Sequence, residues 1–314
     1  MIGRVVKGIG GFYFVHDGER AVMGKARGNL KRNKELIYVG DIVDFDIDEN
    51  DCDNECVINR VVERRNYLTR PPVSNLDMLV VVFSVRNPEV NYPVIDKLLA
   101  GCELKGIEPV ICITKIDLVS PEELEKAAGI YEGIYPLVSV NGVTGEGIDG
   151  LRQLIAGRNA ALAGPSGVGK STITNLLRGE IGGAEDDEAV PEDTSRGARG
   201  TAAAAAETGS ISDKTGRGRH TTRHVEIFPL GEGTYLYDTP GFTSLDMPEM
   251  EVSDVRELFP EMREPGQECR YRDCLHINEP ECGVKKALAE GRINRSRYDS
   301  YLLMVEEVKN YRKF

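Results

Sequence analysis

A glycine-rich segment at residues 164–171 carries the clearest chemical pattern in the chain. It reads GPSGVGKS and matches G-x-x-x-x-G-K-[ST] in full. An apolar stretch (160–163) precedes it and a helical pattern (172–178) follows it, which is the strand, loop and helix context that this motif requires. Glycines let successive backbone N–H groups point into one concavity, and the start of the helix adds partial positive charge. The segment is therefore predicted to bind the phosphates of a nucleotide.

Two side chains of this segment have separate predicted tasks. Lys170 is placed to reach the β- and γ-phosphates, and the hydroxyl of Ser171 is placed to coordinate Mg²⁺. The predicted phosphate-binding residues are Gly164, Pro165, Ser166, Gly167, Val168, Gly169, Lys170, Ser171 and Thr172.

A second motif concerns the base, which a phosphate loop does not select. Residues 114–117 read TKID after an apolar strand pattern and resemble the guanine-reading N-K-x-D motif of GTPases, with threonine in place of the usual asparagine. The carboxylate of Asp117 can accept hydrogen bonds from N1–H and N2–H₂ of guanine, a pair of donors that adenine lacks, so the wrong base would leave acceptors unpaired. The alkyl stem of Lys115 is expected to lie over the base. The predicted guanine-binding residues are Thr114, Lys115, Ile116 and Asp117, joined by Ser139 at the end of the next predicted strand.

A third motif completes a magnesium-dependent site. Residues 238–241 read DTPG and fit D-x-x-G, in which Asp238 would hold Mg²⁺ through water and the N–H of Gly241 would meet the γ-phosphate. Thr221 and Thr222 lie between this motif and the phosphate loop, where GTPases carry a magnesium-binding threonine. We assign Thr222 this role, with an ordinary polar loop as the alternative.

The residue that would activate water is not the usual one. Position 242 is phenylalanine, where many GTPases have a glutamine that orients the attacking water. An apolar side chain cannot do this, so hydrolysis is expected to be slow or to use another group. His220 is the nearest candidate by position, and a surface histidine in a basic loop is the alternative.

The order of these motifs differs from that of a standard GTPase, which runs from phosphate loop to switch threonine, D-x-x-G and N-K-x-D. In this chain the N-K-x-D-like segment (114–117) comes first, and the phosphate loop (164–171), Thr222 and the D-x-x-G segment (238–241) follow it. The cyclic order is preserved but opens at a different point. The sequence therefore predicts a circularly permuted GTPase.

A cysteine-rich segment near the carboxyl end has metal-ligand spacing. The pattern C-x₄-C-x-H-x₅-C offers three thiols and one imidazole from Cys269, Cys274, His276 and Cys282. This is the ligand set of a closed tetrahedral Zn²⁺ site, which is structural and not catalytic. Cys52 and Cys56 form a C-x₃-C pair without further ligands nearby, so we interpret them as free thiols.

The elements that must position these residues fall into three predicted domains. Residues 1–68 contain five short strand patterns (4–7, 12–15, 20–23, 41–45 and 57–61), which suit a small OB-type barrel. Residues 69–245 alternate buried strand patterns with helical ones, which indicates a parallel sheet wrapped by helices, interrupted by an expected mobile loop at 182–213. Residues 246–314 hold the zinc ligands and a helical pattern over 293–314, whose cations, Arg297 among them, are expected to be available to phosphate.

Composition narrows the classes of protein further. The net charge is −12, which disfavours binding of nucleic acid by a general positive field, so any contact must use local basic patches. Residues 25–34 form the clearest such patch, with a solvated loop as the alternative. Neither a membrane-spanning stretch nor a signal peptide is recognised. We expect a cytoplasmic monomer.

Taken together, these motifs resemble the RsgA (YjeQ) family of small-ribosomal-subunit-dependent GTPases over almost the whole chain. The segment GRGRHTTRH at 216–224, the apolar residue 242 and SRY at 296–298 match that family closely. The resemblance implies an OB domain that binds ribosomal RNA, slow GTP hydrolysis stimulated by the small subunit, a role in its late maturation, and a contribution of His220 to hydrolysis.

Two other classes remain to be weighed. A P-loop ATPase or kinase with an appended barrel would share the phosphate loop but would not depend on Asp117. A nucleotide-regulated binder of single-stranded nucleic acid would respond to naked strands, which the charge of −12 disfavours.

Overall fold

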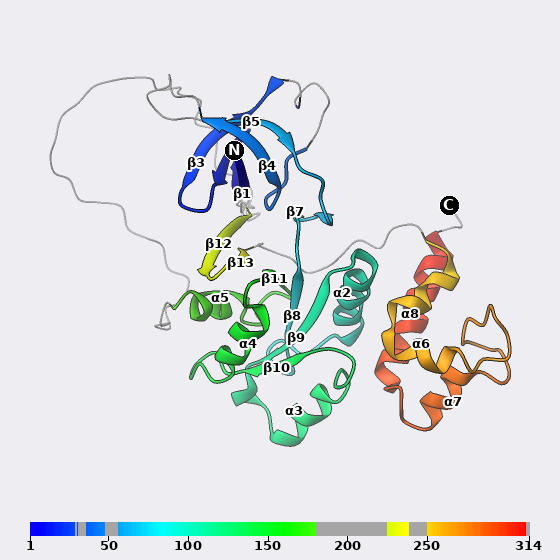
Figure 1. Ribbon diagram of the computed structural model, residues 1–314. Coiled ribbons are helices and arrows are strands. Elements are labelled where there is room, and N and C mark those ends of the chain that lie inside the picture. The colour runs from blue at the N-terminus through cyan, green and yellow to red at the C-terminus, as the bar shows by residue number, and fades with distance from the viewer. Residues whose placement is uncertain (29, 31–35, 48–55, 180–224, 239–249, 312–314) are drawn as a thin grey trace, which may run out of the picture.

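The structure of the chain is a computed structural model that describes residues 1–28, 30, 36–47, 56–179, 225–238 and 250–311. In these residues a small barrel is followed by an α/β unit and a helical unit (Figure 1). The predicted loop at 182–213 lies outside the described residues. No helix in the described part of the chain is both long and apolar enough to cross a membrane.

Five strands at the amino-terminal end close into the predicted OB-type barrel. They run in the order β1-β2-β3-β5-β4, and a further pairing of β1 with β4 closes the ring. Alternate side chains fill its interior, including those of Val5, Val15, Phe45 and Ile58. The strands are β1 (Ile2–Ile9), β2 (Phe12–His16), β3 (Ala21–Ala26), β4 (Ile42–Ile47) and β5 (Cys56–Val61).

The central unit is a parallel sheet covered by helices on both faces. Its parallel strands lie in the order β10-β9-β8-β11-β13, and β12 pairs antiparallel with β13 at one side. Every residue of β8 is buried because alternate side chains enter two different cores. These strands are β8 (Met78–Ser84), β9 (Glu108–Thr114), β10 (Leu137–Val140), β11 (Asn159–Ala163), β12 (Glu226–Gly231) and β13 (Thr234–Asp238).

Two pairs of helices supply the other half of these cores. The helices α2 (Tyr92–Lys105) and α3 (Pro121–Ala128) contribute apolar side chains to one core. The helices α4 (Ile148–Ile155) and α5 (Lys170–Arg178) contribute to the other. The predicted alternation of strands and helices is therefore confirmed.

The barrel is joined to this sheet by main-chain and side-chain contacts that the sequence pattern does not reveal. Lys7 of β1 pairs with Glu226 of β12, and Lys7 Nζ lies 3.0 Å from the carboxylate of Glu226. The hydroxyl of buried Tyr237 on β13 accepts a hydrogen bond from Arg4 Nη1 at 3.2 Å and donates to the carbonyl of Ser74 at 3.1 Å. Ser74 belongs to a short hairpin of β6 (Tyr67–Thr69) and β7 (Pro72–Ser74). The result is one continuous sheet of eleven strands.

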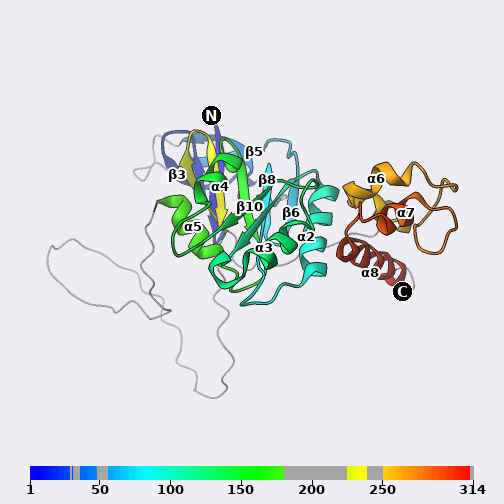
Figure 2. The same ribbon diagram turned by 90° about the horizontal axis from the view of Figure 1, so that it is seen from below.

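The carboxyl-terminal unit is helical and packs against α2, as both Figure 1 and Figure 2 show. Its apolar core includes Phe259, Tyr301 and Val305 and extends to Ala100 of α2. Its elements are η2 (Val252–Leu258), α6 (Pro260–Gly266), α7 (Gly283–Ala289) and α8 (Arg295–Tyr311).

A buried ion-pair cluster fastens this unit to α2 of the α/β unit. Arg297 of α8 is fully buried, and its Nη1 lies 2.8 Å from Asp96 Oδ1 on α2. Its Nε lies 2.7 Å from Glu261 Oε1 on α6, and its guanidinium lies 4.7 Å from the ring centroid of Phe259. The expectation that Arg297 is available to phosphate was therefore wrong, because two carboxylates and aromatic rings already enclose its charge.

Replacing Arg297 is expected to destabilise the protein strongly. Arg297→Ala would leave the carboxylates of Asp96 and Glu261 buried without their partner, at a cost of about 3–5 kcal/mol in the free energy of unfolding. Arg295→Ala is the matched control, because Arg295 lies on the same helix in an exposed pair with Asp299 and should cost at most about 0.5 kcal/mol. Denaturant unfolding measures both, and equal losses would contradict this account of Arg297.

Candidate functional site

The described parts of the predicted nucleotide motifs lie at one edge of the parallel sheet. The strands β9, β10, β11 and β13 end at Thr114, Val140, Ala163 and Asp238, and the carboxyl ends of parallel strands share an edge of a sheet. Loops at such an edge are where α/β proteins bind ligands. Segments that are distant in sequence are thereby brought together.

A cavity of about 600 Å³ opens at this edge. Six of the predicted site residues line it, namely Thr114, Lys115, Asp117, Gly169, Ser171 and Thr172. Its size lies within the range of small-molecule sites, about 300–1,000 Å³. The remaining lining residues are Leu118, Val140, Gly142, Val143, Ile173, Asn175 and Leu176.

One end of the cavity has the character of a base-binding slot. Lys115 adopts a left-handed backbone conformation (φ 54°), and its Nζ donates to the carbonyl of Asn87 at 2.6 Å. Asp117 is exposed at the rim in the short helix η1 (Ile116–Leu118). Val143, on the loop after β10, also lines the cavity and is 87% exposed, although it is apolar. Carboxylate acceptors beside exposed apolar side chains and a lysine stem can hold a planar ring with polar edges.

Thr114 joins the base-binding end to the phosphate loop. It is buried, and its hydroxyl lies 2.6 Å from the carbonyl of Val168 and 3.1 Å from that of Phe83. A hydroxyl carries one proton, so the shorter contact to Val168 is the stronger hydrogen bond. The threonine that replaces the usual asparagine thus ties the two loops together across the sheet edge.

The phosphate loop has the backbone that its glycines permit. Gly164 has a φ of 149°, and a Cβ there would lie 2.0 Å from the carbonyl oxygen of Val82, so a larger residue would displace the loop. Lys170, the first residue of α5, donates from Nζ to the carbonyls of Gly164 and Pro165 at 2.8 and 2.7 Å. Burial lowers the pKa of Lys170. A phosphate would give this ammonium a charged partner in place of two neutral carbonyls.

The loop after β10 is built around Asn141, which follows the predicted contact Ser139 by two positions. Its Oδ1 accepts hydrogen bonds from the N–H groups of Val143 and Thr144 at 2.9 and 3.2 Å. Asparagine at the start of a turn is a recognised sign of this geometry. Ser139, the predicted contact, lies within β10, and the lining residues from this segment are Val140, Gly142 and Val143.

Several predicted site residues cannot be placed. His220, Thr222, Gly241 and the apolar residue 242 lie outside the described residues. Asp238 is described, and it is exposed at the end of β13.

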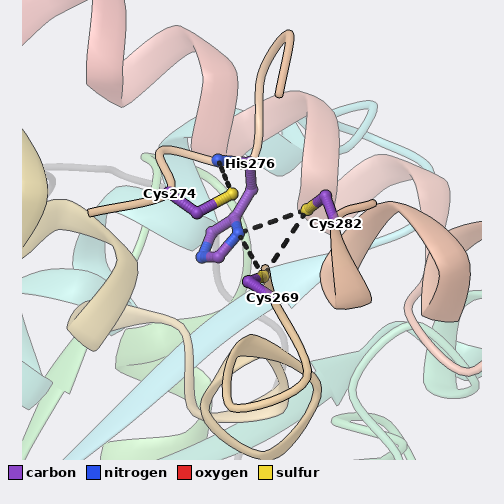
Figure 3. A group of neighbouring side chains, drawn as sticks. All are labelled: Cys269, Cys274, His276 and Cys282. Atoms are coloured by element: carbon purple, nitrogen blue, oxygen red, sulfur yellow. Dashed lines mark hydrogen bonds between the residues drawn. The ribbon is translucent and has the colours of Figure 1, made fainter. Parts of the chain in front are cut away.

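The predicted zinc ligands come together in one cluster, shown in Figure 3. Their ligand atoms all lie within 4.8 Å of one another. Nδ1 of His276 lies 3.5 Å from Cys269 Sγ and 3.4 Å from Cys282 Sγ, and these two sulfurs are 3.8 Å apart. A tetrahedral zinc ion with Zn–S of about 2.3 Å and Zn–N of about 2.0 Å requires S···S and S···N separations of about 3.8 and 3.5 Å. The cluster fits zinc.

The backbone also prepares these sulfurs for a cation. The N–H of His276 points to Cys274 Sγ at 3.4 Å, and that of Lys285 points to Cys282 Sγ at 3.5 Å. Such donors stabilise thiolates. Burial raises the pKa of Cys274, and a bound cation would act in the opposite direction by stabilising its thiolate.

Comparison with known proteins places these features in one family. Residues 61–248 match the model of the RsgA GTPase, and residues 2–53 match that of the RsgA N-terminal domain. The chain is 39% identical to the small ribosomal subunit biogenesis GTPase RsgA of Agathobacter rectalis, with 100% of both chains covered. It is also 39% identical to the RsgA of Caldanaerobacter subterraneus subsp. tengcongensis, covering 99% of this chain and 97% of the relative.

Two solved structures share the fold. YjeQ from Thermotoga maritima superposes with a TM-score of 0.76 at 32% identity, covering 98% of each chain. YloQ, a circularly permuted GTPase, superposes with a TM-score of 0.73 at 29% identity, covering 99% of this chain and 95% of YloQ. The predicted circular permutation is thereby confirmed.

Proposed function

This chain belongs to the RsgA family of GTPases, and from that premise we propose that it hydrolyses GTP slowly alone and faster on the small ribosomal subunit. In this proposal it serves the late maturation of that subunit. The observation that carries it is a single cavity lined both by Asp117, from the guanine-reading motif, and by Ser171, from the phosphate loop. The names of its relatives, small ribosomal subunit biogenesis GTPases, supply the partner.

We assign binding of the guanine base to Asp117 and Lys115. Binding of the phosphates is assigned to the phosphate loop, which Thr114 contacts through the carbonyl of Val168. The carboxylate of Asp117 accepts from guanine, the stem of Lys115 covers the ring, and backbone N–H groups of the loop receive the phosphates. Lys170 turns from its two carbonyl partners to the β- and γ-phosphates. Ser171 and Thr222 are the proposed direct ligands of Mg²⁺, which accompanies GTP, with Asp238 acting through water and Gly241 meeting the γ-phosphate.

The proposed catalytic residues are His220 and Thr222. His220 would orient the attacking water, because residue 242 is phenylalanine and cannot do so. A hydrolytic residue that lies outside the phosphate-loop motif in sequence suits an enzyme that its partner activates by positioning that residue.

The proposed zinc site holds one Zn²⁺ and is structural. Cys269, Cys274, His276 and Cys282 supply four ligands, which fill a tetrahedral shell and leave no position for a substrate. The metal would fix the loop from which α7 and the rest of the helical unit extend.

We propose three working units, 1–68, 69–245 and 246–314, of which the barrel contacts ribosomal RNA. Lys25, at the start of the basic segment 25–34, has its Nζ 4.5 Å from the ring centroid of Phe12 on β2. Paired cations and aromatic rings on a barrel surface suit an RNA strand. Residues 29 and 31–34 of the segment lie outside the described residues. We also propose that the protein is a monomer in the cytoplasm, where small subunits mature, and acts without a membrane.

The permuted order of the motifs suggests how the bound nucleotide, GTP or GDP, could change the binding of the protein to RNA. The D-x-x-G segment ends at Gly241, ten residues before η2, which opens the helical unit. In the GTP state the loops around Thr222 and Gly241 close on the γ-phosphate, and its loss releases them. The affinity of the helical unit for the small subunit then changes.

The nucleotide dependence of subunit binding tests this proposal. Sedimentation with purified small subunits should show binding about tenfold or more tighter with a non-hydrolysable GTP analogue than with GDP, the range of ordinary coupling energies. Lys170→Ala should remove the difference, because this variant loses its contact with the γ-phosphate. Equal affinity of the wild-type protein in both states would refute the switch.

A further inference from the structure

A second pocket, of about 400 Å³, lies beside the zinc cluster in the helical unit. It is lined by three arginines, Arg256, Arg263 and Arg272, together with the amide side chain of Gln267 and the ring of His276. Glu257, Met262 and Gly266 complete the lining. The GTP site described above uses none of these residues.

Two of the arginines are held in place by backbone carbonyls. Arg256 Nη1 donates to the carbonyls of Arg272 and Cys274 at 3.3 and 3.2 Å, and its Nε pairs with Glu257 at 3.2 Å. Arg263 Nη2 donates to the carbonyl of Glu257 and to the carboxylate of Glu103, both at 2.8 Å. Because these guanidinium groups are already fixed, a ligand would not have to order them.

Hydrogen-bond donors in this pocket outnumber acceptors. A guanidinium has five N–H donors, and within the described part of the chain no residue accepts from Arg256 Nη2, from Nε or Nη1 of Arg263, or from exposed Arg272. Among the described lining residues Glu257 is the only acid, and its carboxylate already faces Arg256. The donors of this pocket therefore suit an anion with several acceptor oxygens.

We propose that this pocket binds a phosphate of an RNA backbone, an inference that rests on the proposed binding to the small subunit. Planar guanidinium donors match the oxygens of a phosphate in bidentate geometry. Tyr271, next to Arg272, is 42% exposed, with the guanidinium of Arg270 5.7 Å from its ring centroid. An exposed aromatic ring beside a phosphate site can stack an unpaired base, which favours RNA over an acidic peptide or free phosphate.

The segment that carries the predicted zinc ligands (269–282) also holds one side of this pocket in place. The carbonyls that hold Arg256 belong to Arg272, which lies between two predicted zinc ligands in sequence, and to Cys274, which is one of them. The zinc site would thus serve RNA binding by fixing the arginines and not by contacting RNA.

Arg272→Ala tests the pocket with little risk to folding, because no described residue accepts a hydrogen bond from this exposed side chain. It should weaken binding to purified small subunits about tenfold, the value of one charge-assisted contact, and should lower the slope of log affinity against log salt by about one. Basal GTP hydrolysis and zinc content should not change. Arg292→Ala is the matched control, since Arg292 is exposed, pairs with Glu290 and lies outside the pocket; it should bind as the wild type does.

A photo-cross-link identifies the class of partner. With Tyr271 replaced by benzoylphenylalanine, illumination on the subunit should attach the protein to ribosomal RNA. Attachment to ribosomal proteins alone, or wild-type affinity of Arg272→Ala, would overturn the pocket proposal and leave the GTPase assignment intact. Failure of the wild-type protein to bind subunits would instead refute the proposed function itself.

Discussion

Asp117→Asn is expected to weaken GTP binding by about a hundredfold or more, because two charge-assisted hydrogen bonds to guanine are lost, each worth about 1.5–3 kcal/mol. The amide nitrogen would also face the donors of the base, so attraction becomes repulsion. Asp117 is exposed at the rim of the cavity, and the variant should therefore fold normally. Titration calorimetry with GTP and GDP measures the loss.

The same variant should gain affinity for xanthosine triphosphate, whose second ring carbonyl can accept a hydrogen bond from the new amide. This gain distinguishes a lost contact from a damaged site. Asp149→Asn is the matched control, because Asp149 is an exposed carboxylate on α4 that pairs with Arg152 and does not line the cavity. An unchanged preference for GTP in Asp117→Asn would assign the base to other residues and reopen the possibility of an ATP-binding protein.

Removal of zinc is expected to unfold much of the helical unit. Binding of a structural zinc ion is worth about 10–16 kcal/mol in small zinc domains and appears as folding free energy. Cys282 belongs to the proposed zinc cluster and is the N-cap of α7, where its sulfur accepts a hydrogen bond from the N–H of Lys285. Cys282→Ser should therefore lose zinc, expose residues 250–311 to proteases and abolish subunit binding, while GTP binding persists.

Zinc analysis by atomic absorption, with limited proteolysis, checks this expectation. Cys112→Ala is a useful control, because Cys112 is a buried thiol of β9 outside the cluster. It should lower stability through a lost packing contact, yet keep one zinc per chain. Full zinc content and protease resistance in Cys282→Ser would show that the cluster is not the metal site.

The fold could be predicted where local pattern decides it. The buried run that became β8 and the alternating strands of the barrel have periodicities that few other structures satisfy. The junction between barrel and sheet could not be predicted, because it depends on one pairing of Lys7 with Glu226 and on Tyr237 reaching Arg4, residues more than 200 positions apart. No periodicity within the chain encodes such a contact.

The candidate site divides in the same way. Short motifs with a fixed spacing identified the phosphate loop, the TKID segment and the zinc ligands, since each chemistry demands particular residues at particular intervals. The contact of Thr114 with Val168 and the burial of Arg297 between Asp96 and Glu261 arise only from tertiary packing. Arg297 shows the limit most clearly, because a cation near the end of a chain is ordinarily solvated and this one is fully buried.

The central claim, that this chain is a GTPase that the small ribosomal subunit activates, is tested most directly by steady-state GTP hydrolysis with and without purified small subunits. Large subunits at the same concentration provide the control for nonspecific stimulation, and Lys170→Ala provides the background rate. The account predicts slow hydrolysis by the protein alone and a many-fold increase with small subunits only. An unchanged rate, or equal stimulation by both subunits, would contradict it.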